Sequence, residues 1–343
     1  GASGVRLFTY LFLLTSFLTL FTSNDVVILT ITYIVLYICT YAGIDPIPYL
    51  LAQFFAANIF SMGLYVGNPT NIVIAEAFEI GFTEFASWMF VPSVLATFTC
   101  LLSLLLVFRR RIPKRIKTLD TDPLCSLKDR NGAVFGLLML GSMLFFIGLL
   151  AEWTGTQPWT IALSFASATA LYDLIFTRKG SRVKIVLHRM PWKIAPFLVG
   201  LFIIVEGLAA SGWTGLLASQ ISQYVSKGAL TSVVFGLSFM FALAAGLMNN
   251  HPMTVFFIKT LKESLASQLP ENARISSTLA LVIGSNLGAN YMLTGSLAGL
   301  MWSKILSEKG IKISFSEFSK YGFTIMTLVT LTASLSLAVI LML

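Results

Sequence analysis

The segment GNPTN at residues 67–71 interrupts an apolar stretch at residues 47–80, and GSNLGAN at residues 284–290 interrupts a second apolar stretch at residues 275–305. Glycine, asparagine and proline at these points predict that the helix stops and restarts. A lipid bilayer tolerates broken backbone only where protein buries it or where it lines a cavity. Each segment is therefore interpreted as a broken membrane helix with a function.

A second pair of breaks precedes the first. Ser23-Asn24-Asp25 divides apolar sequence in the first half of the chain, and Asn249-Asn250-His251-Pro252 divides it in the second half. Paired breaks at corresponding places in two halves are the best sequence pointer to a transporter binding site. The sequence thus predicts an all-α membrane protein, a polytopic bundle of two inverted repeats, each with a re-entrant hairpin and a broken helix.

Composition agrees with this class of protein. Hydrophobic residues make up 56% of the 343 residues and charged residues only 11%, and the mean hydropathy is +0.84. Soluble domains carry about 25% charged residues, so a water-soluble core is excluded. About 20 residues cross the hydrocarbon as a helix. Further spans are predicted at residues 5–22, 26–42, 86–108, 133–151, 158–176, 194–210, 229–247 and 321–343. Residues 211–227, which include Trp213, are interpreted as a re-entrant or interfacial stretch, with an external loop as the alternative.

The net charge of +8 has a specific distribution. Fourteen of the 23 basic residues lie in two clusters, at residues 109–130 and 178–193, and both clusters flank long apolar runs. Such loops lie on the cytoplasmic side of a membrane. The charge is therefore explained by topology in the inner or plasma membrane, and no nucleic-acid partner is expected.

Comparison of the two halves predicts a domain organisation in which the first repeat lacks residues at its amino-terminal end. The first repeat covers residues 1–108, a basic cytoplasmic linker covers residues 109–132, and the second repeat covers residues 133–343. About 119 residues separate Asn131 from Asn250, whereas 23 precede Asn24. If the repeats correspond, the first one is incomplete at its amino-terminal end by about three membrane helices.

Residues suited to holding a small solute gather at the four breaks. Free N–H and C=O groups at the ends of interrupted helices carry partial charges that bind ions and polar solutes. Asparagine adds both a donor and an acceptor, and glycine permits close approach of the backbone. The predicted solute-binding residues are Asn24, Asn68, Thr70, Asn71, Asn250, Ser285, Asn286 and Asn290, and the predicted helix-break glycines are Gly67, Gly284 and Gly288. The alternative is a set of kinked helices whose side chains satisfy one another.

Two ionisable residues stand at the earlier breaks. Asp25 has apolar neighbours on both sides, and a charge inside a membrane is costly and by default functional. Its role is left open between cation ligand, proton carrier and helix cap. His251 occupies the corresponding place in the second half and is interpreted as a partner in proton coupling, or as a donor to a nearby carbonyl. Glu76 and Glu206 are weaker candidates because both are near a membrane interface.

Other chemistry finds little support in the sequence. Cys39, Cys100 and Cys125 are scattered, so neither a disulfide framework nor a zinc site is indicated, and thiol ligation of a soft solute is a minor alternative. No phosphate-binding loop, HExxH or GxSxG motif occurs. We therefore expect no enzyme activity, no cofactor and no metal site, and energy from an ion gradient or a separate ATPase.

The sequence resembles the arsenite efflux permeases, or arsenical pump membrane proteins, of the ion transporter superfamily. The resemblance covers essentially the whole chain. It is carried by FTSNDVV, GNPTNIVIA, PWKIAPFLVGLFIIVEG, MNNHPMTV, GSNLGANYMLTGSLAGL and LSEKGIKISF, at residues 21–27, 67–75, 191–207, 248–255, 284–300 and 306–315. The resemblance implies export of arsenite or antimonite driven by membrane potential or protons, a homodimer, and in some members a soluble ATPase partner.

Two features depart from the arsenite branch and leave alternatives. His251 stands where an apolar residue is expected, and the GNPTN form is similar to antiporters and anion carriers. A sodium/proton antiporter, with Asp25 as the exchanging carboxylate, is the first alternative, and an anion or dicarboxylate carrier is the second. A channel or membrane receptor is a remote alternative.

Overall fold

The computed structural model describes residues 3–117, 130–154, 156–176, 194–265 and 270–343, together with the isolated residues 184, 187, 188 and 192. Within these ranges every secondary-structure element is a helix, and no β-strand occurs. The protein is thus an all-helical, polytopic membrane protein, as the sequence predicted. Cys125, residues 118–129 of the basic linker and most of the second basic cluster lie outside the described residues.

The chain forms two compact units. One unit contains residues 1–80, 84–119 and 202–343, and the other contains residues 81–83 and 120–201. The second unit is built on α6 (Arg130–Thr154) and α7 (Pro158–Phe176). Stacking of Phe135 on Tyr172, with ring centroids 3.9 Å apart, joins these two helices.

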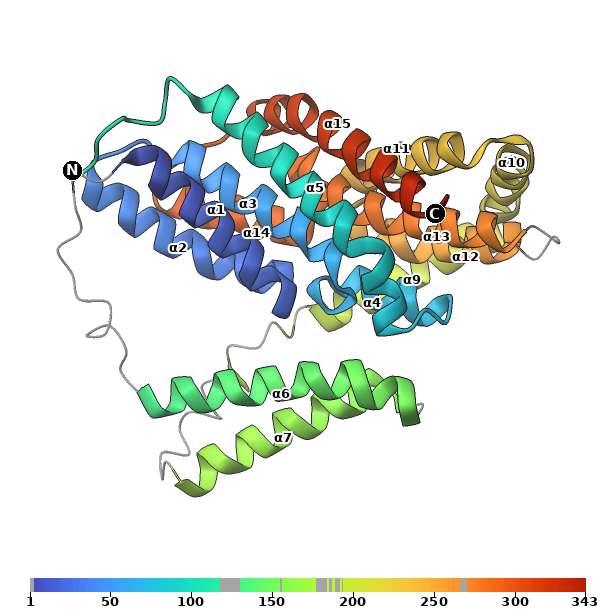
Figure 1. Ribbon diagram of the computed structural model, residues 1–343, viewed down its shortest axis with the longest axis horizontal. Coiled ribbons are helices and arrows are strands. Elements are labelled where there is room, and N and C mark those ends of the chain that lie inside the picture. The colour runs from blue at the N-terminus through green and yellow to red at the C-terminus, as the bar shows by residue number, and fades with distance from the viewer. Residues whose placement is uncertain are drawn as a thin grey trace. The chain divides into compact units, whose positions relative to one another are not determined.

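The larger unit contains the same succession of elements twice. A helix pair is followed by a buried helix, two 3₁₀ turns, a short helix and a long helix. In the first half these are α1 (Gly4–Phe21), α2 (Asn24–Ala42), α3 (Ile47–Phe60), η1 (Ser61–Gly63), η2 (Tyr65–Gly67), α4 (Pro69–Ala77) and α5 (Phe82–Phe108). In the second half they are α11 (Leu230–Met248), α12 (Asn250–Leu265), α13 (Glu271–Leu287), η4 (Gly288–Asn290), η5 (Leu293–Gly295), α14 (Leu297–Glu308) and α15 (Phe315–Ile340). Figure 1 shows α1 and α2 extending toward one end of this unit, and α10 and α12 toward the other.

Five helices among the described residues are long and apolar enough to cross a membrane: α1, α2, α5, α11 and α15. Each coincides with a predicted span to within a few residues. Helix α9 (Ile194–Ala210) is followed by α10 (Trp213–Lys227), and the chain bends by 75° between them, as in a broken span or a re-entrant loop. Residues 213–227 are thus helical, in agreement with the predicted re-entrant or interfacial stretch.

Helices α3 and α13 form the centre of the larger unit. Residues 48–59 of α3 and residues 276–287 of α13 are buried on every side. A helix can be buried on every side only if none of its faces carries polar groups that require water. Helix α3 meets this condition because its sequence is almost wholly apolar. In α13 the serine and threonine hydroxyls at residues 276–278 donate to backbone carbonyls one turn earlier.

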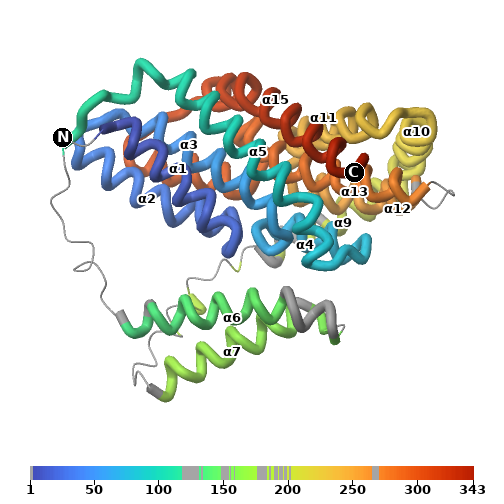
Figure 2. The backbone as a smooth tube through the Cα atoms, in the orientation of Figure 1, coloured from blue at the N-terminus to red at the C-terminus, as the bar shows by residue number. Residues whose placement is uncertain are grey.

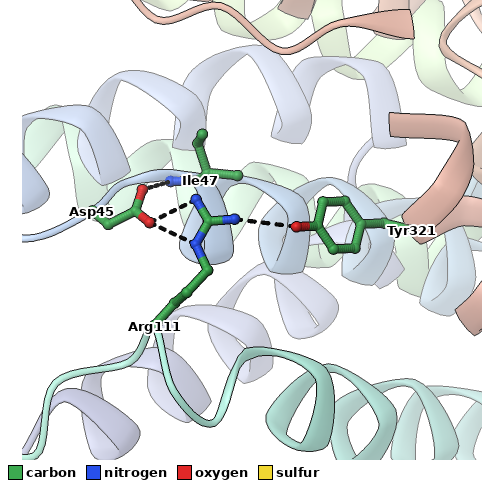
Figure 3. Close-up of polar contacts among 4 residues, drawn as sticks. All are labelled: Asp45, Ile47, Arg111 and Tyr321. Carbon is green, nitrogen blue, oxygen red and sulfur yellow. Dashed lines mark hydrogen bonds and ion pairs between the residues drawn. The ribbon is translucent and has the colours of Figure 1, made fainter. Parts of the chain in front are cut away.

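The long helices α5 and α15 run side by side, as Figure 2 traces, and Thr99 donates a hydrogen bond to Thr332 between them. Near the end of α5, Arg111 donates to Asp45 Oδ2 over 2.8 Å and to the Tyr321 hydroxyl of α15 over 3.1 Å (Figure 3). Asp45 also accepts from the backbone N–H of Ile47, the first residue of α3. Partial burial acts to lower the pKa of Arg111, but its bonds and attraction to Asp45 and Tyr321 outweigh burial and raise it.

We expect Arg111→Gln to lower the melting temperature of the purified protein modestly, because a half-exposed ion pair contributes up to about 1 kcal/mol. The exposed neighbour Arg110 is the matched control, and Arg110→Gln should leave the melting temperature unchanged. Equal losses in the two variants would show that Arg111 does not hold α3, α5 and α15 together.

Candidate functional site

The first helix break lies between α3 and α4. The chain passes through the 3₁₀ turns η1 and η2 and becomes extended at Asn68, with φ −143° and ψ 132°. The Asn68 side chain then caps α4 by accepting from the backbone N–H of Thr70 at 3.1 Å. Pro69 occupies the first helical position, where a missing N–H costs nothing. The break therefore falls at GNPTN, as predicted.

The second break begins later than predicted. Helix α13 continues through Gly284, Ser285 and Asn286 and ends at Leu287, and the 3₁₀ turn η4 starts at Gly288. Gly284 is a packing residue, because a Cβ added there would lie 2.3 Å from Cβ of Phe241 in α11. The prediction of Gly284 as a helix-break glycine is therefore wrong, whereas Gly67 and Gly288 lie in the breaks.

The first break contacts the last turn of α13, next to the second break, through Asn286. Its Oδ1 accepts from Nδ2 of Asn68 at 2.9 Å and from the Ser61 hydroxyl at 2.8 Å. Its Nδ2 donates to Oδ1 of Asn71 at 2.6 Å and to the carbonyl of Val282 at 2.8 Å. One amide thus joins the end of α13 to both sides of the other half's break. Beside it, the Thr70 hydroxyl donates to Ser285 Oγ at 3.3 Å.

A second chain of amides links the first hairpin to the second break. Nδ2 of Asn24, at the start of α2, donates to Oδ1 of Asn58 at 2.8 Å. Nδ2 of Asn58 donates in turn to Oδ1 of Asn290 at 2.8 Å. Because Asn58 lies in α3 and Asn290 in η4, this chain also crosses between the two halves of the protein.

The tip of the second hairpin holds strained backbone. Asn249, between α11 and α12, has φ 76° and ψ 143°, a conformation that residues with a Cβ rarely adopt. Its side chain compensates by donating to the carbonyl of Thr294 at 3.2 Å and accepting from the N–H of His251 at 3.3 Å. Strain of this kind persists where surrounding bonds fix it, often at functional sites.

Each hairpin tip carries one ionisable residue. Asp25 stands in the first turn of α2 and His251 in the first turn of α12. Nδ1 of His251 is 2.9 Å from Oδ1 of Asn250. The N-cap of α2 is Ser23, which makes no side-chain cap bond. Glu76 and Glu206 are exposed, and Glu206 pairs with Lys259.

All eight predicted solute-binding residues are buried, each with at most 1% of its surface exposed. Asn68, Thr70, Asn71, Ser285 and Asn286 bond to one another around the first break, whereas Asn24 and Asn290 meet through Asn58. Sequence reasoning missed Asn58 and Ser61, and it placed Asn249 in a break without including it among the solute-binding residues. Asn58 is a polar residue inside an apolar run, which is the signal that would have found it.

The chemistry of this cluster is that of neutral donors and acceptors. Amide and hydroxyl groups predominate, with one carboxylate and one imidazole at the hairpin tips. Within the described ranges, no group of three or more His, Cys, Asp or Glu side chains is arranged to hold a metal ion. The arrangement can hold a small polar molecule by hydrogen bonds, with one carboxylate and one imidazole at the hairpin tips.

Known proteins match nearly the whole chain. The family model described as arsenical pump membrane protein matches residues 1–342. An arsenical pump membrane protein of Escherichia coli is 31% identical over 344 residues, covering 97% of this chain and 77% of the relative. The one of Yersinia enterocolitica is 32% identical over 340 residues, with the same coverage. A putative arsenical pump membrane protein of Bacillus subtilis (strain 168) is 28% identical over 351 residues, covering 96% and 77%.

Proposed function

Because this chain belongs to the arsenical pump membrane protein family, we propose that it is a secondary carrier that exports arsenite and antimonite from the cell. Family membership itself makes the protein an arsenical transporter of the inner membrane, with several membrane-spanning helices, rather than an enzyme. The resemblance drawn from the sequence is thereby confirmed. The proposal adds to this the direction of transport, the energy source and the identity of the solute.

The observation that carries the proposal is the direct bonding of the first helix break to the last turn of α13, next to the second break. Asn68 in one half and Asn286 in the other share a buried hydrogen bond of 2.9 Å. Interrupted backbone from both halves therefore converges inside the protein, as in carriers whose solute site is built from broken helices. This supports a site formed by Asn24, Asn68, Thr70, Asn71, Asn250, Ser285, Asn286 and Asn290.

The solute in this proposal is arsenous acid, the neutral trihydroxyl form of arsenite. Its hydroxyl groups both donate and accept, so they match asparagine amides and Ser or Thr hydroxyls. Asp25, assisted by His251, carries the coupling charge. One charge moving down 100 mV supplies about 2.3 kcal/mol, so a single proton or charge is sufficient to drive substantial export.

We propose that the two halves are inverted repeats, and the packing of their helices supports this. The same element order occurs in both halves, and the packing of α2 against α14 is mirrored by that of α12 against α4. We propose that residues 1–108 and 133–343 hold the two repeats, with residues 109–132 as the cytoplasmic linker. A homodimer and a soluble ATPase partner remain predictions of the resemblance.

Growth of cells that lack other arsenic exporters tests the proposed function. Expression of the full-length protein should restore growth on arsenite, and inside-out membrane vesicles should accumulate radioactive arsenite when respiration energises them. Unchanged arsenite sensitivity together with increased tolerance of sodium or lithium would contradict the proposal and indicate an antiporter.

A further inference from the structure

Several buried polar atoms at the two hairpin tips have no hydrogen-bond partner among the described residues. They are Oδ1 of Asn24, Oδ1 of Asp25, Nδ2 of Asn250 and Oγ1 of Thr254. Asn24 and Asn250 are 0% exposed and Thr254 is 1% exposed. An unpaired buried polar group costs about 1–3 kcal/mol, so a cluster of them indicates a missing binding partner.

These atoms lie close together in the fold. Thr254 follows Asn250 by one turn of α12 and therefore lies on the same face of that helix. Asn24 is linked through Asn58 to Asn290 of η4, whereas Asn249, the neighbour of Asn250, donates to Thr294 of η5, and η4 and η5 contact each other. The unpaired atoms thus belong to one region, next to the bonded amides of the helix breaks.

The unpaired atoms define what a ligand must offer. Oδ1 of Asn24 needs a donor, Nδ2 of Asn250 needs an acceptor, and the Thr254 hydroxyl satisfies either need. An oxyanion without protons offers only acceptors, and the nearby Asp25 carboxylate repels it. A metal cation offers nothing to the Asn250 amide N–H. A neutral molecule with several O–H groups satisfies all three side chains.

Thiols do not contribute to this region among the residues that the structure describes. Cys39 is 15 residues after Asn24 in α2, about 22 Å away at 1.5 Å per residue. Cys100 lies in α5, which supplies none of the bonded amides described above. Neither Cys39 nor Cys100 therefore offers a soft ligand at the hairpin tips.

We propose that the carrier recognises the hydroxyl groups of its solute and not the central atom, so that neutral boric acid is also bound and transported. This inference rests on the proposed function and extends its substrate class to uncharged trihydroxyl acids. Boric acid keeps three hydroxyl groups around a small central atom but has no affinity for thiols. Its planar shape differs from pyramidal arsenous acid, so its apparent affinity is expected to lie within about a hundredfold of that for arsenite.

The test uses inside-out vesicles that contain the full-length protein. Initial uptake of radioactive arsenite is measured with increasing boric acid, and boron accumulation is measured directly by mass spectrometry. Boric acid should raise the apparent KM for arsenite without changing the maximal rate, and energised vesicles should accumulate boron above vesicles without the protein. Arsenate, a charged oxyanion, should not compete.

Two threonines of α12 supply a matched pair of variants. Thr254→Val removes the unpaired hydroxyl, so both the KM for arsenite and the inhibition constant of boric acid should rise about threefold to tenfold, the value of one neutral hydrogen bond. The melting temperature should not fall, because no described residue loses a partner. Thr260→Val removes a buried hydroxyl that already donates to the carbonyl of Phe256, and should leave both constants unchanged.

The outcomes separate the two proposals. Arsenite uptake that boric acid does not inhibit would overturn recognition by hydroxyl groups and leave the arsenite carrier intact. Competition without boron accumulation would overturn the transport of boric acid. Equal effects of Thr254→Val and Thr260→Val would overturn the placement of the solute at the hairpin tips. Absence of arsenite uptake in vesicles that contain folded protein would overturn the proposed function and the inference with it.

Discussion

Asn286→Ala should abolish arsenite export, because this side chain holds the two helix breaks together. The substitution removes the acceptor of Ser61 and Asn68 and the donor to Asn71 and Val282. Each buried partner left unpaired costs about 1–3 kcal/mol. The breaks are therefore expected to separate or reorganise, and a solute site formed between them is lost.

Loss of folding must be distinguished from loss of the site in this experiment. Gln53 offers the matched control, because it is another fully buried amide that bonds to Thr32 and to the carbonyl of Ile28, away from the breaks. At equal amounts of membrane-inserted protein, Gln53→Ala should retain arsenite uptake, and Asn286→Ala should show none. Retained uptake in Asn286→Ala would mean that the contact between the breaks is dispensable.

Asp25→Asn should uncouple transport from its driving force. The change keeps the size of the side chain but removes the charge assigned to coupling. Gradient-driven accumulation of arsenite should disappear, because the variant no longer moves the coupling charge. One charge crossing a potential of 100 mV supplies about 2.3 kcal/mol of free energy. Exchange of arsenite across the membrane without a gradient should persist, because the solute-binding amides are unchanged.

Purified protein in lipid vesicles allows both activities to be measured on one sample. Accumulation is driven by an imposed pH gradient and potential, and exchange is followed as the entry of labelled arsenite into vesicles preloaded with unlabelled arsenite. Glu76→Gln, at an exposed carboxylate of α4, should leave both activities intact. If Asp25→Asn accumulates arsenite normally, the coupling charge lies elsewhere.

Much of the helical architecture was predictable because lipid imposes a length and an apolar composition on each span. Helices α7 and α9 begin and end at the residues that the sequence predicted. The break at GNPTN was also predictable, since proline and a capping asparagine act locally. The order of elements in both halves follows from the same local signals.

The exact start of the second break was not predictable from local sequence. Glycine signals both a helix end and a close approach between helices, and only the tertiary structure separates the two. Gly284 packs against Phe241 of α11, whereas Gly288 opens the break. Asn58 was missed for a related reason. It lies within a continuous helix, and its bonding to Asn24 and Asn290 depends on long-range packing.

The central claim is that the solute binds where the hairpin tips and helix breaks of both halves converge. Anomalous X-ray diffraction at the arsenic edge, from crystals of the full-length protein soaked in arsenite, measures this position directly. The arsenic peak should lie where its hydroxyl oxygens reach Asn24 and Asn250 at about 3 Å, beside Asn68 and Asn286. A single peak elsewhere, with these side chains still bonded only to protein, would contradict the claim.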